Sequence, residues 1–202
     1  MDLKTIEFDK EEDYYQRHFL EYHTQTFNVD PASFLEPLTK YLRPGDRILD
    51  VGCGSGRDLL WFKSRGFVAT GFERSAGLAR LARQNTGCEV VEGDFESFDF
   101  SSFQVDTVTL IGALVHVPHE KMVEILTSIA HSLREDGYIL ITLKAGNGIN
   151  TLPDGRIFYL WNKSLLANLF DKLGLTLIDF SRQVSKIRPD DVWLGYVLKK
   201  IS

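Results

Sequence analysis

Short apolar runs alternate with segments of helical periodicity over most of the chain, from about residue 47 onward. The apolar runs predict strands over residues 47–51, 67–72, 88–91, 105–111, 138–143, 175–180 and 192–198. The periodic segments predict helices over residues 58–65, 75–85 and 118–133, and a further helix that Asn162 caps and Gly174 ends. This alternation predicts an α/β sheet with helices on both faces, in which the last two strands form an antiparallel hairpin across residues 181–191.

The first 41 residues have a different character, because they are charged and rich in aromatic side chains. Tyr15, Phe19 and Tyr22 recur at helical spacing, which predicts a short helix with one aromatic face. A second helix is predicted from Pro31 to about residue 41, with Asp30 as its N-cap. We therefore expect an N-terminal helical lid over residues 1–41, followed by a ligand-binding domain over residues 42–202.

Composition narrows the classes of function. The chain has 202 residues, 44% of them hydrophobic, which suits one globular domain with a small elaboration. The net charge of −5 and the absence of a Lys/Arg-rich run argue against nucleic acid as a partner. The two cysteines, Cys53 and Cys88, provide neither a disulfide framework nor metal-ligand spacing. No leader or membrane-length apolar run is visible, so the expectation is a cytoplasmic protein, monomeric or homodimeric, with no metal.

The most specific motif follows the first predicted strand. That strand ends in Asp50 and continues into a loop with glycine at every second position, Gly52, Gly54 and Gly56, before a helix begins. Glycine lets the backbone approach a ligand closely and adopt angles that a side chain would forbid. A loop of this kind with a carboxylate at its entry suits a nucleoside ligand that carries a positive group.

A dinucleotide is the competing ligand. The nicotinamide fingerprint, G-x-G-x-x-G/A, requires a small residue at its sixth position, where this chain has Arg57. The acid expected about twenty positions on is present as Glu73, but both ligand classes use such an acid for ribose. The sequence therefore favours S-adenosyl-L-methionine (SAM) over a dinucleotide.

With these residues in place, the chain resembles the class I SAM-dependent methyltransferases over roughly residues 42–198. The resemblance rests on the glycine loop, on Glu73, on Glu92-Gly93-Asp94-Phe95, on Gly112-Ala113-Leu114-Val115-His116-Val117-Pro118 and on Leu133-Arg134-Glu135-Asp136-Gly137-Tyr138-Ile139-Leu140. It implies a Rossmann-like seven-stranded sheet of order 3-2-1-4-5-7-6 with strand 7 antiparallel. It also implies that Glu73 takes the ribose hydroxyls and Asp94 the adenine amino group. Arg74 departs from the small or apolar residue that many relatives have there.

The resemblance implies a cofactor-binding set at the strand ends. Its members are Asp50, Gly52, Cys53, Gly54, Ser55, Gly56, Asp58, Glu73, Arg74, Ser75, Asp94, Phe95, Ile111 and Gly112. Some of these also have a purely structural interpretation. Asp58 suits the helix dipole at a helix start, and Cys53 is a small residue that the loop tolerates.

The methyl acceptor is expected to be a small molecule methylated on oxygen, nitrogen or sulfur. The segment after the fourth strand lacks the Pro-Pro-aromatic motif of DNA amino-methyltransferases, and neither cysteine follows a proline as in cytosine C5 enzymes. His116 is the candidate catalytic base, since imidazole can accept a proton near neutral pH. The candidate acceptor-binding residues are Tyr14, Tyr15, His18, Tyr22, His116, Lys144, Arg156 and Tyr159.

Within that set, Lys144 and Arg156 bound a long glycine-containing stretch, residues 144–156, which we expect to be a mobile loop that recognises an anion on the acceptor. Trp161 and Trp193 are expected to be packing residues. Two other functions remain open: a SAM-binding regulatory subunit without turnover and, less favoured because of Arg57, an NAD-dependent oxidoreductase.

Overall fold

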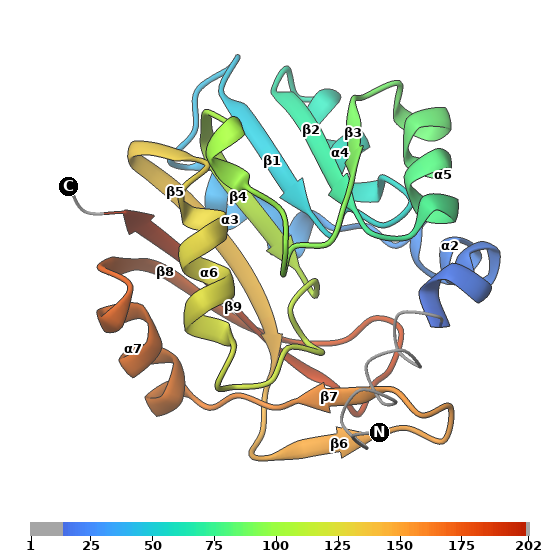
Figure 1. Cartoon of the computed structure of the whole chain (residues 1–202), viewed down its shortest axis with the longest axis vertical. Coiled ribbons are helices and arrows are strands. Elements are labelled where there is room, and N and C mark those ends of the chain that lie inside the picture. The colour runs from blue at the N-terminus through green and yellow to red at the C-terminus, as the bar shows by residue number, and fades with distance from the viewer. Residues whose placement is uncertain (1–13, 201–202) are drawn as a thin grey trace.

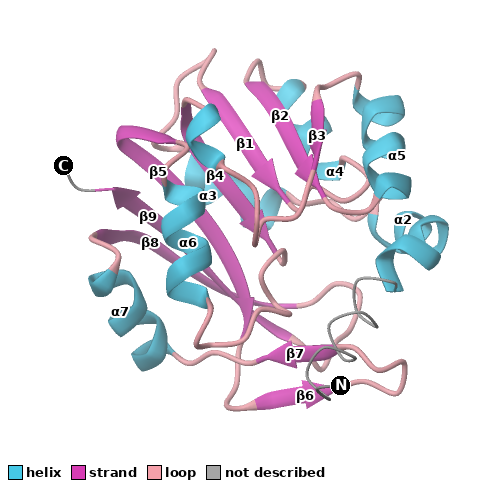
Figure 2. Ribbon diagram, viewed as in Figure 1, coloured by secondary structure: helices cyan, strands magenta, loops and turns pink. Residues whose placement is uncertain are grey.

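The structure, a computed structural model, describes residues 14–200 (Figures 1 and 2). Its helices are α2 (Phe19–Thr26), α3 (Ala32–Thr39), α4 (Arg57–Lys63), α5 (Ala76–Thr86), the short 3-10 helix η1 (Phe100–Ser102), α6 (Met122–Ala130) and α7 (Lys163–Lys172). Its strands are β1 (Arg47–Val51), β2 (Val68–Glu73), β3 (Val90–Glu92), β4 (Val105–Ile111), β5 (Leu133–Lys144), β6 (Ile149–Thr151), β7 (Ile157–Tyr159), β8 (Leu175–Val184) and β9 (Val192–Lys200).

Seven strands form one sheet in the order β3-β2-β1-β4-β5-β9-β8. The pairs from β3 to β5 are parallel, whereas β9 runs antiparallel to both of its neighbours. Since β6 and β7 form a separate two-stranded sheet, β8 and β9 are the sixth and seventh strands of the main one. The predicted order, the antiparallel seventh strand and the late hairpin are confirmed.

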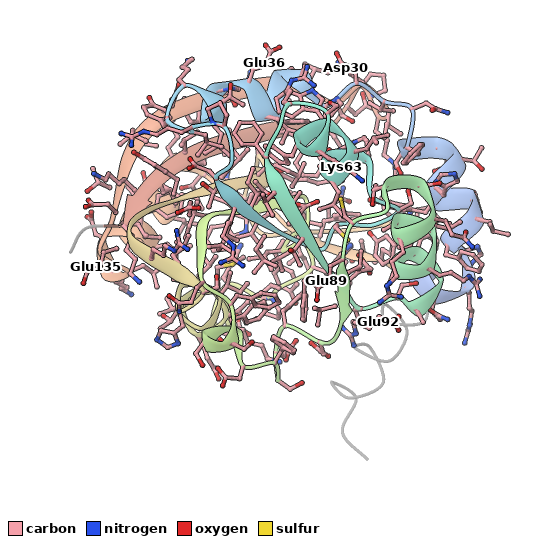
Figure 3. The ribbon with its side chains drawn as sticks, turned by 90° about the horizontal axis from the view of Figure 1, so that it is seen from above. Asp30, Glu36, Lys63, Glu89, Glu92 and Glu135 are labelled. Atoms are coloured by element: carbon pink, nitrogen blue, oxygen red, sulfur yellow. The ribbon has the colours of Figure 1, made fainter. Side chains whose placement is uncertain are left out.

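The core consists of two layers, one on each face of the sheet, as the alternation of side chains along the strands shows. Ile48, Leu140 and Val197 pack against Leu35 and Leu38 of α3 and the aromatic side chains of α4. Their immediate neighbours along the same strands point the other way and pack with the apolar faces of α6 and α7. Seen from above, side chains fill the space on both sides of the sheet (Figure 3). The predicted helices on both faces are confirmed.

The helix predicted over residues 118–133 is shorter than expected, and its C-terminal part is wrong. Residues 118–121 form a turn, closed by the Lys121 N–H donating to the Pro118 carbonyl at 3.0 Å, and α6 begins only at Met122. Leu133 starts β5 and pairs with Val105, because this apolar side chain is buried in the sheet layer rather than on a helix. Residues 135–137 form a bulge within β5, where Asp136 adopts a φ of 61°.

The loop predicted over residues 144–156 is wrong in part, because it contains a strand. Lys144 is the last residue of β5, and the segment then forms a β-hairpin in which β6 pairs with β7, Ile149 opposite Tyr159 and Thr151 opposite Ile157. The hairpin lies beyond the carboxyl end of β5 (Figure 1). The sequence pattern did not predict this hairpin, because the partner strand β7 lies outside the stretch that was interpreted as a loop.

The N-terminal region divides into two parts with different roles. α3 contributes Leu35 and Leu38 to the core, whereas α2 has no fully buried residue and lies beside α5 (Figure 1). Asp30 accepts a hydrogen bond from the Ala32 N–H at 3.0 Å, but the N-cap position of α3 belongs to Pro31, one residue later than predicted. The predicted lid also includes residues 1–13, which lie outside the described residues.

Candidate functional site

A first cavity opens at the carboxyl ends of β1, β2 and β4 and holds about 970 Å³ of space, including its open mouth. In an open α/β sheet this edge, near the point where strand order reverses, is the usual ligand site. Most of the lining residues follow strands directly, and α2 and the residue Tyr15 close the remaining side. The lining residues are Tyr15, Tyr22, Gly52, Gly54, Phe72, Glu73, Arg74, Ser75, Leu78, Phe95, Glu96, Ile111, Gly112, Ala113, His116 and Val117.

The glycine loop lies directly against this cavity. Gly52 has a φ of 73°, and a Cβ added there would lie 2.6 Å from Cβ of Ala113, so only glycine fits between β1 and the segment after β4. Gly54 lies under the ring of Tyr22. Gly56 instead begins α4 and lies against Ala82 of α5, so its role is helix packing.

Asp50 lies behind the cavity wall, and only one of its two carboxylate oxygens accepts a hydrogen bond from the described residues. Its side chain is buried, and Oδ1 accepts a hydrogen bond from the Thr109 hydroxyl at 2.7 Å. Oδ2 is buried with no hydrogen-bond partner among the described residues. Burial, and next the charge of Asp58, raise the Asp50 pKa well above its usual value. A buried acceptor without a partner is costly, so this position suits a ligand that brings a positive charge.

Glu73, at the end of β2, lines the first cavity and also holds the glycine loop. Its carboxylate accepts hydrogen bonds from the N–H groups of Gly54 and Ser75, both at 2.9 Å. Burial raises the Glu73 pKa, and the backbone hydrogen bonds oppose that rise. Each carboxylate oxygen can accept more than one hydrogen bond, so this side chain retains capacity for ligand hydroxyls.

Some residues of the predicted cofactor-binding set line the first cavity, and the others lie outside its wall. Eight members of the set line the first cavity: Gly52, Gly54, Glu73, Arg74, Ser75, Phe95, Ile111 and Gly112. Asp50, Cys53, Ser55, Gly56 and Asp58 lie behind the wall, where Cys53 packs with Leu59 and Asp58 pairs with Arg57 at 2.7 Å. Asp94 is not in the wall either, since its carboxylate accepts from the Glu96 N–H at 2.9 Å and lies 3.5 Å from Arg74.

A second cavity of about 1030 Å³, again counted with its open mouth, adjoins the first. Four residues line both: Tyr15, Tyr22, Ile111 and Gly112. We call these four the junction. The second cavity is bounded by α2, α3, the ends of β4 and β5, the hairpin and the β8–β9 connection, residues 185–191. A ligand in one cavity can therefore meet a ligand in the other at the carboxyl end of β4.

At the junction Tyr15 is bonded to the candidate base. The Tyr15 hydroxyl lies 3.0 Å from Nε2 of His116, and Nδ1 of His116 lies 2.6 Å from the Ile157 carbonyl. A carbonyl only accepts, so Nδ1 carries the hydrogen, and Nε2 of the neutral ring accepts from Tyr15. Burial, and then the charges of Arg156 and Lys144, lower the His116 pKa to about 4, against the opposing bond to Ile157.

The two cations predicted to recognise an anion both line the second cavity, but each already has a carboxylate partner. Lys144 donates to Asp191 at 2.7 Å, and Arg156 pairs with Asp154 with its guanidinium 3.9 Å from the centre of the Tyr14 ring. Burial lowers the Lys144 pKa, and the bond to Asp191 opposes that shift.

The remaining predicted acceptor residues lie outside the cavity walls. Tyr14 stacks on His18, which is exposed and 3.5 Å from Glu21, and Tyr159 packs edge-on against His119. Sequence reasoning missed several wall residues of the second cavity: Phe34, Arg57, Phe158, Arg188 and Trp193. Trp161 is buried as predicted, whereas Trp193 lines the cavity and approaches Gly112. No local motif marks these residues, because they come from five separate segments.

The described residues lack both a cluster of metal ligands and a membrane-spanning helix. Among residues 14–200, no cluster of three or more His, Cys, Asp or Glu could hold a metal ion. Within the same range, none of the helices has the length and apolarity that crossing a membrane requires.

Comparison with known proteins finds a methyltransferase domain in part of the chain. A family model for a methyltransferase domain matches residues 48–137. The chain is 28% identical over 109 residues to an uncharacterized protein of Methanocaldococcus jannaschii, which covers 54% of this chain and 41% of that protein. It is 28% identical over 140 residues to a putative methyltransferase of Geobacillus sp. (strain WCH70), covering 62% and 57%. The chain thus spans about half the length of these curated relatives.

Among solved structures, the fold is similar to that of Burkholderia thailandensis 1,6-didemethyltoxoflavin-N1-methyltransferase, crystallised with 1,6-didemethyltoxoflavin and S-adenosylhomocysteine. The TM-score is 0.81 at 20% identity, and the superposition covers 100% of this chain and 92% of that one. At this identity the likeness establishes the fold, and the fold agrees with the sheet order described above.

Proposed function

We propose that this chain, whose methyltransferase domain and fold are those of the class I SAM-dependent methyltransferases, transfers a methyl group from SAM to a small-molecule acceptor. One observation carries the proposal: two cavities meet at a junction of four residues at the end of β4. A reaction in which one ligand attacks the other in line requires two adjoining compartments of this kind.

The first cavity fits SAM. When bound, SAM supplies a methyl group made electrophilic by a positively charged sulfur. In the chain, Gly52 and Gly54 allow close approach of the backbone, and Glu73 offers acceptors for ribose hydroxyls. The buried carboxylate of Asp50, behind the wall, adds negative charge that favours a positive group on the ligand. The relative of known structure bears a product of SAM, which supports the same cofactor here.

The second cavity holds the acceptor in this proposal, and α2 with Tyr15 acts as the lid. Tyr15 and Tyr22 pack edge-on, 5.2 Å between ring centres, and line both cavities. They cover the junction and exclude water from it. Positioning and exclusion of water of this sort can lower a barrier by roughly 7–11 kcal/mol in favourable cases.

Proton removal from the acceptor involves Tyr15 before His116. His116 lines only the first cavity, and its Nε2 accepts a hydrogen bond from the Tyr15 hydroxyl. His116 therefore serves as base through Tyr15, which takes the acceptor proton on its oxygen as its own proton passes to Nε2. An amine acceptor attacks through its own lone pair and has no need of this route.

The test is turnover. Purified protein is incubated with SAM and a panel of small phenols, amines, thiols and heterocycles, and S-adenosylhomocysteine (SAH) is measured by mass spectrometry. Acceptor-dependent SAH supports the proposal. SAH binding by calorimetry without turnover on a broad panel favours the SAM-binding regulatory subunit, and binding of NAD in place of SAH favours the oxidoreductase.

A further inference from the structure

The second cavity has a charge opposite to that of the whole chain. The chain carries a net charge of −5, yet the described residues that line this cavity include five basic side chains and only two acidic ones. The basic ones are Arg57, Lys144, Arg156, Lys186 and Arg188, and the acidic ones are Asp30 and Asp191. A cavity of one sign within a protein of the other raises the local concentration of oppositely charged ligands.

Four of the five cations are already engaged by a carboxylate of the chain. Arg57 pairs with Asp58 and Arg156 with Asp154, both through two or more short contacts. The other two pairs are Lys144 with Asp191 at 2.7 Å and Lys186 with Asp30 at 3.5 Å. These cations give the walls their shape, but each pair is close to neutral.

Arg188 is the exception. It is half-buried, lines the second cavity, and its guanidinium has no hydrogen-bond or ion-pair partner among residues 14–200. Arg188 lies close enough to Lys144 and Asp154 to lower the pKa of each. One unpaired positive charge therefore remains in a cavity whose other charges are matched.

The backbone around Arg188 is held in place. The β8–β9 connection is closed by the Ser185 N–H donating to the Asp191 carbonyl at 2.8 Å and by the Asp191 N–H donating to the Arg188 carbonyl at 2.9 Å. The Ser185 hydroxyl also accepts from the Arg188 N–H at 3.1 Å. A fixed backbone limits the side-chain positions that Arg188 can reach, which favours recognition of a defined group.

Aromatic side chains form a further part of the wall of the second cavity. Tyr22, Phe34, Phe158 and Trp193 all line it, and the Trp193 ring approaches Gly112 at the junction. Aromatic walls favour a planar apolar ligand, and an arginine fork binds a carboxylate through two parallel hydrogen bonds.

We propose that Arg188 binds a single carboxylate on a planar aromatic acceptor and so selects acceptors with one negative charge, while the methyl-accepting atom lies at the junction. This inference rests on the proposed function and names the class of acceptor for the same site. It also changes the assignment made from the sequence, because the anion is assigned to Arg188 and not to Lys144 or Arg156.

The experiment measures binding of matched probes to SAH-loaded protein by calorimetry. The probes are 4-hydroxybenzoate, 4-aminobenzoate and indole-3-carboxylate, each compared with its own primary amide. Wild type is expected to bind at least one carboxylate roughly 10- to 100-fold more tightly than its amide, the range of a charge-assisted pair. In Arg188→Gln this ratio falls to near one, and Arg188→Lys restores part of it.

Arg182→Gln is the matched control, because Arg182 is an exposed arginine on β8 that lies outside both cavities. It removes the same charge from the same strand region and is expected to keep the wild-type ratio. A preference that survives in Arg188→Gln overturns the inference, and so does a wild type that binds none of the carboxylates better than its amide. SAH affinity separates the two proposals: loss of SAH binding in wild type overturns the proposed function itself, whereas intact SAH binding without carboxylate preference overturns only the role of Arg188.

Discussion

The two cavities differ in how the chain builds them. The first is lined mainly by short stretches that directly follow β1, β2, β3 and β4, so its walls lie beside the strand ends that the sequence pattern reveals. The second is assembled from α2, α3, the end of β5, β7 and the β8–β9 connection, which are far apart in the chain. The cavity proposed for the cofactor can thus be read from local motifs, whereas the cavity proposed for the acceptor depends on segments that only folding brings together.

The charges of the two cavity walls also differ. The first cavity has two carboxylates, Glu73 and Glu96, and one cation, Arg74, in its wall. The second has an excess of cations, of which Arg188 alone lacks a carboxylate partner among the described residues. Variants of the first cavity should therefore change SAH binding, and variants of the second should change only acceptor recognition.

The largest effect is expected from Gly52→Val. The new side chain would collide with Ala113 at a position whose φ is 73°, so we expect SAH affinity to fall by roughly 100-fold or more in calorimetry. Gly45→Val is the matched control, since Gly45 has a φ of 90° and nothing within 4 Å of an added Cβ. Both variants carry the backbone strain, and only Gly52→Val should lose SAH. Equal SAH affinities in the two folded variants would contradict the role given to the loop; Gly52→Ala serves if Gly52→Val does not fold.

Asp50→Asn should have the next largest effect. It should weaken SAH binding but stabilise the ligand-free protein. Loss of the carboxylate is expected to weaken SAH binding roughly 10- to 100-fold, because a negative charge directly behind the wall no longer attracts the positive group of the ligand. Without ligand the variant should be the more stable protein at neutral pH. The Asp50 pKa is raised in the folded state above the ordinary 3.8, so wild-type stability falls as pH rises from about 4 through that raised pKa.

The measurement for Asp50→Asn is urea unfolding from pH 3.5 to 8, with and without SAH. The advantage of the free variant should vanish toward the acid end, where Asp50 is protonated in both states of wild type. Thr107→Val is a control that should leave SAH affinity unchanged, since the buried Thr107 hydroxyl, on the adjacent strand, also has no hydrogen-bond partner within residues 14–200. A free variant less stable than wild type at pH 8 would overturn the assignment of Asp50 as a costly buried charge.

Tyr15→Phe tests the junction between the cavities. The substitution keeps the aromatic cover and removes the hydroxyl that meets Nε2 of His116. For a hydroxyl acceptor we expect kcat to fall by roughly tenfold, less than the usual loss for a proton-transfer group because His116 remains, with SAH affinity nearly unchanged. Since the His116 pKa is lowered to about 4, wild-type kcat should show no inflection near pH 6.5 from this ring. Tyr14→Phe is the control, because Tyr14 lies outside both cavities and this variant should behave as wild type. An equal fall of kcat in both variants would contradict proton transfer through Tyr15.

The smallest expected effect compares two helix caps. The Ser75 hydroxyl caps α5 beside the first cavity, and Asn162 caps α7 away from both cavities. Ser75→Ala and Asn162→Ala should each lose about 1 kcal/mol of unfolding free energy, the usual cost of a lost cap. Only Ser75→Ala should also weaken SAH binding, by a few-fold. A binding loss of the same size in Asn162→Ala would show that the caps act through global stability alone.

The sequence predicted the fold well where the hydrophobic periodicity agrees with the local turn and capping residues. β1 and β4 occur at the predicted residues, and Asn162 caps α7 through the Leu165 N–H as expected. It failed at the end of the helix predicted over residues 118–133, where Leu133 reads as part of an amphipathic helix but pairs with Val105 in the sheet. It failed again at residues 144–156, because a three-residue strand has too little pattern to be recognised without its partner.

By itself the sequence determined the sheet, the glycine loop and the carboxylates at the strand ends, since each depends on residues close together in the chain. The tertiary structure alone decided that one buried oxygen of Asp50 has no hydrogen-bond partner in the described part of the chain. It likewise decided that Tyr15 meets His116 across 101 positions, and that Lys144 and Arg156 are neutralised by nearby acids. It also decided that Arg188 remains as the unpaired charge among the described residues of the second cavity. Ion pairing and burial depend on which side chains meet in space, and a sequence pattern records only which residue types are present and how they are spaced.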